Sequence, residues 1–130
     1  MRPALLGAGT NVLAPDEGLR GLVIVTRDCL MCLERTDETH IAALAGVSMA
    51  KLAIFAQEAN LTGLEFAHGI PGTVGGGVYM NAGAYGGEIM RVAEETDFLR
   101  MDGSMQTFTG VAQGFAYRTS AFQSMQGVIV

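Results

Sequence analysis

The sequence predicts a single small domain of the α+β class, and three observations support this. Short apolar runs rich in β-branched residues recur between polar clusters, as strands do. One central segment carries apolar residues at the 3.6-residue spacing of a helix. Glycine supplies 18 of the 130 residues, and eight of these fall within residues 65–88. A chain of this length has room for one hydrophobic core.

The first third of the chain is expected to form strands. An apolar pair, Leu5 and Leu6, leads into a glycine turn, and residues 15–18 form a polar turn. Three runs of strand-like composition follow, at residues 21–26, 29–34 and 40–47. They predict a small, mostly antiparallel sheet.

A helix is expected next. Ser48 has a side chain suited to the N-cap position, and the helix is predicted to extend to about Asn60. Thr62 and Gly63 are expected to stop it. One face of this helix would carry the apolar residues Leu52, Phe55, Ala56 and Ala59.

A hairpin is expected in the last third of the chain. Residues 92–101 and 104–109 flank Asp102 and Gly103, which form the dipeptide most typical of a tight turn between strands. The β-branched residues 128–130 close the sequence and read as part of a further strand.

The composition argues against several classes of protein. The net charge is −5 with only eight basic residues, which disfavours a nucleic-acid or anionic-membrane surface. No apolar run reaches the roughly 20 residues that cross a bilayer, and the N-terminus has no signal-like pattern. We therefore expect a cytoplasmic protein that binds neither nucleic acid nor membrane.

The two cysteines, Cys29 and Cys32, form a Cys-x-x-Cys pattern. No second pair of cysteines or histidines stands at zinc spacing, so no metal site is expected. On a strand the two side chains would point to opposite faces, and the favoured interpretation is a pair of ordinary buried thiols.

The glycine-rich segments are the candidates for binding. Residues 7–11 lack the spacing of a Rossmann turn or a P-loop, and by themselves they favour a hairpin turn over an anion-binding loop. Residues 70–76 and 81–87 form two consecutive glycine-rich turns around the apolar residues 78–80. Because each glycine costs conformational entropy, this density favours close approach of a backbone to a flat, phosphorylated ligand.

Four segments also resemble a known family: residues 6–13, 63–76, 80–89 and 115–123 are similar to the signature segments of the UDP-N-acetylenolpyruvoylglucosamine reductases. The resemblance implies an FAD-binding domain of the vanillyl-alcohol-oxidase or PCMH type, incomplete at both ends. It also implies FAD as cofactor, NADPH as hydride donor, and reduction of UDP-N-acetylenolpyruvoylglucosamine to UDP-N-acetylmuramate for peptidoglycan synthesis.

The same resemblance assigns roles to individual residues. It implies that Arg118 is the catalytic residue and that Arg118, Tyr85 and Tyr117 contact the substrate. The planar guanidinium of Arg118 suits the enolpyruvyl carboxylate. The FAD contacts that it implies are Gly7, Ala8, Gly9, Thr10 and Asn11 in a first loop, Ile70, Pro71, Gly72, Thr73, Val74, Gly75 and Gly76 in a second, and Asn81, Ala82, Gly83, Ala84 and Gly86 beside the flavin.

The family is much longer than this chain, so residues 1–130 are expected to be a partial FAD-binding domain without the C-terminal substrate-binding domain. The family's serine proton donor and late glutamate have no counterpart here, and the chain alone is expected to be inactive. Two alternatives remain open. One is a stand-alone or remnant module that binds FAD or a nucleotide. The other is a different flavoprotein of the same fold, such as an oxidase with covalent flavin, although no histidine or cysteine falls in the usual attachment loop.

Overall fold

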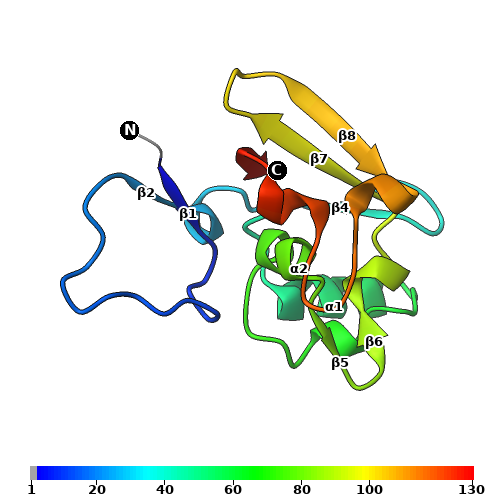
Figure 1. The fold of residues 1–130 in the computed structure, drawn as a ribbon. Helices are drawn as coiled ribbons and strands as arrows, with labels where there is room; N and C mark the ends of the chain where they lie inside the picture. The colour runs from blue at the N-terminus through cyan, green and yellow to red at the C-terminus, as the bar shows by residue number, and fades with distance from the viewer. Residues whose placement is uncertain (1–2) are drawn as a thin grey trace.

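The computed structural model describes residues 3–130, in which small sheets surround two helices (Figure 1). This confirms the α+β class. The helices are α1 (Met49–Glu58) and α2 (Val74–Met80). The strands are β1 (Ala4–Leu6), β2 (Val23–Val25), β3 (Leu33–Arg35), β4 (Ile41–Ala43), β5 (Gly83–Ala84), β6 (Gly87–Glu88), β7 (Glu95–Arg100), β8 (Met105–Thr109) and β9 (Gly127–Ile129).

The first two strands lie to one side of the body and run parallel (Figure 1). Ala4 stands opposite Val23, and Leu6 stands opposite Val25. A hairpin joins antiparallel strands, so the interpretation of residues 7–11 as a hairpin turn is wrong. The long connection between β1 and β2 instead leaves this glycine loop free to lie against another part of the chain. The polar turn at residues 15–18 is confirmed by a 2.9 Å hydrogen bond from the Gly18 amide to the Pro15 carbonyl.

The next two strands, β3 and β4, pair antiparallel but are shorter than predicted. A 3₁₀ turn at Thr26–Asp28 follows β2, and β3 begins only at Leu33, four residues later than the predicted start at residue 29. At the other end β4 stops at Ala43, although the Leu44 and Gly46 amides still donate to the Cys32 and Leu30 carbonyls, at 2.9 and 2.8 Å. Ala45 and Val47 accept hydrogen bonds from the amides of Gly75 and Val74, at 2.9 and 2.7 Å.

Helix α1 confirms the predicted helix and its cap. The Ser48 hydroxyl accepts a hydrogen bond from the Lys51 amide at 3.2 Å, which satisfies one of the unpaired donors of the first turn. Leu52 and Ala56 are buried, as the apolar periodicity predicts. The helix ends before Thr62 and Gly63, because Asn60 adopts the left-handed conformation with φ of 57°.

Helix α2 was predicted as turns, and that prediction is wrong. The Thr73 hydroxyl caps the helix by accepting from the Gly76 amide at 3.2 Å. A Cβ atom on Gly75 would lie 2.7 Å from the Ala45 Cβ, and one on Gly77 would lie 2.8 Å from the Met49 sulfur. These two glycines therefore let α2 pack closely against its own protein rather than against a ligand.

The hairpin of β7 and β8 is confirmed, with Gly103 in the left-handed region at φ of 85°. Strand β9 pairs with the opposite edge of β7. Below this sheet the Phe98 and Phe122 rings stack with centroids 5.6 Å apart, and Phe108 meets Phe122 edge to face at 5.3 Å. These rings join Met49 and other buried residues of both helices in one core.

The interpretation of the cysteines as buried thiols is wrong, because both are exposed and free. Neither lies in a strand. Cys29 follows the 3₁₀ turn, where its thiol donates a weak hydrogen bond of 3.5 Å to the Thr26 carbonyl, and Cys32 precedes β3. Within residues 3–130 no cluster of three or more metal-binding side chains is found. None of the described helices is long and apolar enough to cross a bilayer.

Candidate cofactor site

The fold brings the first two predicted cofactor loops into contact, although 61 residues separate the atoms that join them. The Thr10 hydroxyl donates to the Pro71 carbonyl at 2.9 Å. Gly7 lies so close to Thr73 that a Cβ atom on the glycine would stand 2.5 Å from the threonine hydroxyl oxygen. Glycine is required at position 7 for this approach.

The paired loops present backbone N–H groups without partners. Within the described part of the chain, the amides of residues 8–11, of Gly72 and of Thr73 donate to no carbonyl or side chain. The amides of Val74, Gly75 and Gly76 differ, since the protein itself satisfies each of them. The unpaired amides of this region therefore lie in the loops and not in the first turn of α2.

Arg118 reaches the first loop from the far end of the chain. Its Nη2 donates to the Asn11 Oδ1 at 3.2 Å, across 107 residues of sequence. Arg118 stands at the tip of a tight turn that Ala116 and Thr119 close with reciprocal backbone hydrogen bonds of 3.1 and 3.2 Å. Its φ of 52° is unusual for a residue other than glycine, so surrounding contacts must hold it.

Two side-chain amides provide those contacts. The Gln123 Nε2 donates to the Arg118 carbonyl at 3.2 Å and to the Tyr79 carbonyl at 3.0 Å, near the C-terminus of α2, where helical carbonyls lack partners. The Asn81 Nδ2 donates to the Ala116 carbonyl at 3.0 Å. The sequence offered no local signal for either contact, because the partners lie on different elements.

Asn81 is a predicted FAD contact whose side chain is already committed within the fold. It is buried, and its φ is 44°. The Asn81 Nδ2 donates a hydrogen bond to the Glu88 carboxylate at 3.0 Å, and the Asn81 Oδ1 accepts one from the Met90 amide at 2.9 Å. With the bond to Ala116, this side chain joins the end of α2 to the two segments that follow it.

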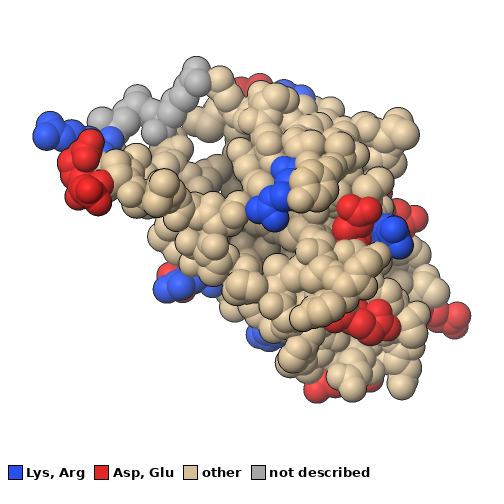
Figure 2. Space-filling model, turned by 60° about the horizontal axis from the view of Figure 1, so that its bottom comes forward, with Lys and Arg blue, Asp and Glu red and all other residues tan. Residues whose placement is uncertain are grey.

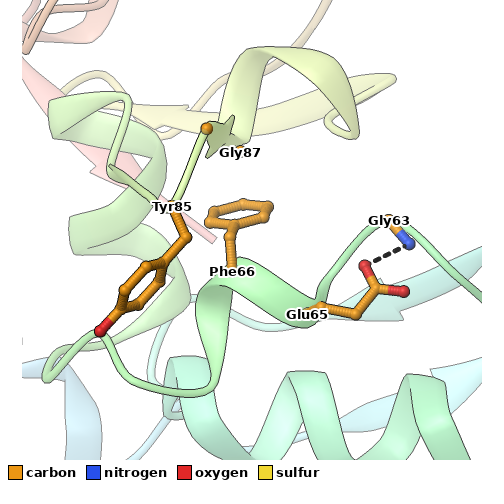
Figure 3. A pocket seen from close by; sticks show the side chains of 6 residues that line it. Gly63, Glu65, Phe66, Tyr85 and Gly87 are labelled. Atoms are coloured by element: carbon orange, nitrogen blue, oxygen red, sulfur yellow. Dashed lines mark hydrogen bonds between the residues drawn. The ribbon is translucent and has the colours of Figure 1, made fainter.

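Tyr85 and Gly86 lie at a separate place, the turn between β5 and β6 (Figure 3). They line a hollow of about 320 Å³ together with Phe66, Glu65 and glycines of both segments. The Phe66 ring points toward Gly87, while the Tyr85 side chain points away from it (Figure 3). Tyr85 is 97% exposed and Tyr117 is 90% exposed, so both predicted substrate contacts are open to solvent.

A larger hollow of about 1110 Å³ runs between the β3–β4 pair and the start of β7. Of the predicted cofactor residues only Val74 lines it. His40, on its rim, contacts Asp37 with 2.8 Å between nitrogen and oxygen, and it also contacts Glu94. The Asp37 carboxylate raises the pKa of His40, with a smaller contribution from Glu94. These ionic contacts lie outside the paired loops.

On the face shown in Figure 2, lysine and arginine side chains are scattered singly and form no stripe. At the paired loops, the groups that could meet an anion are the unpaired backbone amides, with Arg118 as a nearby side-chain cation.

Comparison with known proteins identifies this arrangement. The family model described as "FAD binding domain" matches residues 2–109. The chain belongs to the FAD binding domain family. The match covers the two paired loops and ends before Arg118.

Individual relatives of this FAD binding domain carry a common name. UDP-N-acetylenolpyruvoylglucosamine reductases of Lactobacillus delbrueckii subsp. bulgaricus and Halalkalibacterium halodurans are 39% and 42% identical over 126 residues, which make up 97% of this chain and 42% of each relative. The crystal structure of UDP-N-acetylenolpyruvylglucosamine reductase (MurB) from Thermus caldophilus superposes with a TM-score of 0.78 at 30% identity, covering 98% of this chain and 46% of that chain. The chain thus spans less than half the length of these relatives.

The described residues fit the pyrophosphate of FAD. Two adjacent loops offer unpaired amides. Gly9 and Gly72 adopt positive φ values of 73° and 148°, and neither has a side chain that would cover the backbone. Nothing but the Leu6 side chain, at 3.9 Å, would stand near a Cβ atom on Gly9. Consecutive amides in such left-handed turns form the concave anion sites called nests. Within the second loop, the side of Gly75 that a Cβ would occupy faces Ala45, and its amide donates to the Ala45 carbonyl.

Proposed function

We propose that this chain is the FAD-binding part of an NADPH-dependent reductase that converts UDP-N-acetylenolpyruvoylglucosamine to UDP-N-acetylmuramate in the cytoplasm, for peptidoglycan synthesis. The observation that carries the proposal is the meeting of three predicted site segments. The amides of residues 8–11 and 72–73 have no acceptor among the described residues, the Thr10 hydroxyl joins the two loops, and Arg118 contacts the first of them. The names of the relatives supply the substrate.

The paired loops bind the FAD pyrophosphate in this proposal. Their amides are fixed before the cofactor arrives, since Thr10 already ties one loop to Pro71 in the other. The single hydroxyl proton of Thr10 is donated to the Pro71 carbonyl, so Thr10 contributes to phosphate binding through its backbone amide. Residues 81–86 run beside the flavin. When bound, FAD supplies the hydride-transfer chemistry.

Arg118 recognises the enolpyruvyl carboxylate and stabilises negative charge that develops on the substrate. Its guanidinium has five N–H donors in a rigid plane and stays protonated at all working pH values. A single contact, to Asn11, engages one of its nitrogens among the described residues, which leaves donors for a two-point bond to a carboxylate. Tyr85 and Tyr117, both exposed, supply further contacts to the sugar nucleotide.

The remainder of the reaction belongs to a substrate-binding domain outside these 130 residues. The relatives are more than twice as long as the matched region. We therefore propose that the chain binds FAD but does not by itself complete the reduction, because the proton donor for the substrate is not on it.

The test compares the chain alone with the chain joined at Val130 to the rest of the Thermus caldophilus reductase. Both are loaded with FAD, supplied with NADPH and UDP-N-acetylenolpyruvoylglucosamine, and followed by NADPH oxidation. The joined protein is expected to turn over and its R118A variant to lose most of that activity, while the chain alone gives none. A joined protein that retains FAD but leaves the substrate unreduced would overturn the proposal. In that case a stand-alone FAD-binding module would be the better description.

A further inference from the structure

We propose that Arg118 is also a positioning residue for the cofactor loop: through Asn11 it holds the first glycine loop closed over the FAD pyrophosphate site. The inference rests on the FAD site proposed above. It assigns to one side chain a contact with the substrate and a latch on the cofactor loop, so that the two sites are coupled.

The first loop has few other attachments. It begins where β1 leaves the body, and the connection from there to β2 runs outward at the edge of the molecule (Figure 1). Residues 9–21 are all exposed. Within the described residues, the side chains that tie this connection to the body are Thr10, through Pro71, and Asn11, through Arg118. Removing either tie leaves the other as the principal restraint.

The partner that Asn11 meets is held unusually firmly. The turn that carries Arg118 is closed by two backbone hydrogen bonds, and side chains from the C-cap of α2 and from the 3₁₀ helix Ala121–Ser124 fix its carbonyls. Because the backbone of Arg118 is already ordered, closing the latch costs the entropy of the first loop and of two side chains, with no further cost on the Arg118 backbone. A charge-assisted hydrogen bond can offset that cost.

The latch bears on the amides that the cofactor needs. Asn11 is itself the last of the residues 8–11 whose amides are unpaired, so fixing its side chain also fixes the end of the nest. The same contact brings the positive charge of the guanidinium next to a proposed binding site for two phosphates. Substituting Asn11 removes the latch but keeps the positive charge of Arg118. The effect of the Asn11–Arg118 hydrogen bond on FAD binding can therefore be separated from the effect of the charge.

The test is an FAD titration of the 130-residue chain and of its N11A, R118A and N11A/R118A variants, followed by flavin fluorescence. Each single substitution is expected to raise the Kd for FAD about five- to tenfold, which is the range for one partly exposed charge-assisted hydrogen bond. The double variant is expected to bind only as weakly as R118A, because the second substitution removes an interaction that is already lost. Additive effects, or an N11A variant with unchanged Kd, would overturn the latch.

Two matched controls complete the experiment. R20A removes the same charge from an exposed position in the same connection and is expected to leave the Kd unchanged. R118K keeps the charge but not the reach and geometry of the guanidinium, and it is expected to bind FAD as weakly as N11A. If R118K instead binds as the unmodified chain does, the charge alone is responsible and the latch is refuted.

A second measurement reports on the loop without the cofactor. Trypsin cleaves after Arg20, which lies in the exposed connection, and loosening the loop should speed that cut. Cleavage at Arg20 is expected to be several times faster in N11A than in the unmodified chain, and equal rates would contradict the latch. If the unmodified chain binds no FAD, the proposed function fails while this proteolysis result still decides the inference about the loop.

Discussion

Substituting Gly75 by alanine should destabilise the protein, although alanine is the better helix former. In an unobstructed helix the change would stabilise by about 0.5–1 kcal/mol. At this position the new methyl group would lie 2.7 Å from the Ala45 Cβ and 3.2 Å from the Ala45 carbonyl oxygen. The backbones cannot separate cheaply, because the Gly75 amide is bonded to that carbonyl at 2.9 Å. Overpacking of this kind costs about 1–3 kcal/mol, so a net loss of about 1–2 kcal/mol is expected.

The neighbouring Gly76 supplies the control. It is exposed, and the nearest atom to an added Cβ is the Thr73 hydroxyl oxygen at 3.4 Å. G76A is therefore expected to raise the free energy of unfolding by up to about 1 kcal/mol. Urea denaturation followed by circular dichroism measures both variants without cofactor, with the slope m as a check on the unfolded reference. A G75A variant at least as stable as the unmodified chain would refute the packing argument for α2.

Three further predictions concern other contacts. The proton NMR titration of His40 should have its midpoint above the ordinary 6.5, because Asp37 and Glu94 favour the charged imidazole, and D37N should lower this midpoint. The contribution of charged His40 to folding stability is complete below pH 6.5 and is lost as pH rises through the folded-state pKa. A midpoint at or below 6.5 would contradict the contact. T10V removes the bond to Pro71 and should weaken FAD binding severalfold in a fluorescence titration, with unchanged affinity as the contrary result. S48A should cost about 1 kcal/mol in urea denaturation through loss of the α1 cap, and a change below a few tenths would count against it.

Elements with a local signal were predictable from the sequence. The N-cap Ser48 and the periodicity that follows it specify α1, and the Asp102 and Gly103 pair specifies the β7–β8 hairpin. In both cases the residues that decide the structure lie within a few positions of one another. The positions of α1 and of the β7–β8 hairpin therefore follow from local sequence, with little dependence on tertiary contacts.

Helix α2 shows where local reasoning fails. Its three consecutive glycines have poor helix propensity and indicate a turn. The helix forms because its buried face packs against Ala45 and Met49, at distances that only glycine permits. One local signal was available, since Thr73 is a competent N-cap residue followed three positions later by its partner, Gly76.

The candidate site was predictable only in part. Glycine content pointed to residues 70–76 and 81–87, and residues 7–11 were assigned to the cofactor only through the family resemblance. The contact of residues 7–11 with the second loop depends on Thr10 and Pro71, which no periodicity relates. The place of Arg118 beside Asn11 follows from the folded chain and not from spacing. Backbone conformation also decides which glycines remain available, since Gly75 turns inward while Gly9 and Gly72 do not.

The central claim is that the amides of the two paired loops bind the FAD pyrophosphate. The most direct measurement is a titration of the ¹⁵N-labelled chain with FAD, followed by amide chemical shifts. The largest shifts are expected on residues 8–11 and on Gly72 and Thr73, whose amides are unpaired among the described residues. Saturable FAD binding that leaves these amides unmoved, with shifts confined to other segments, would contradict it.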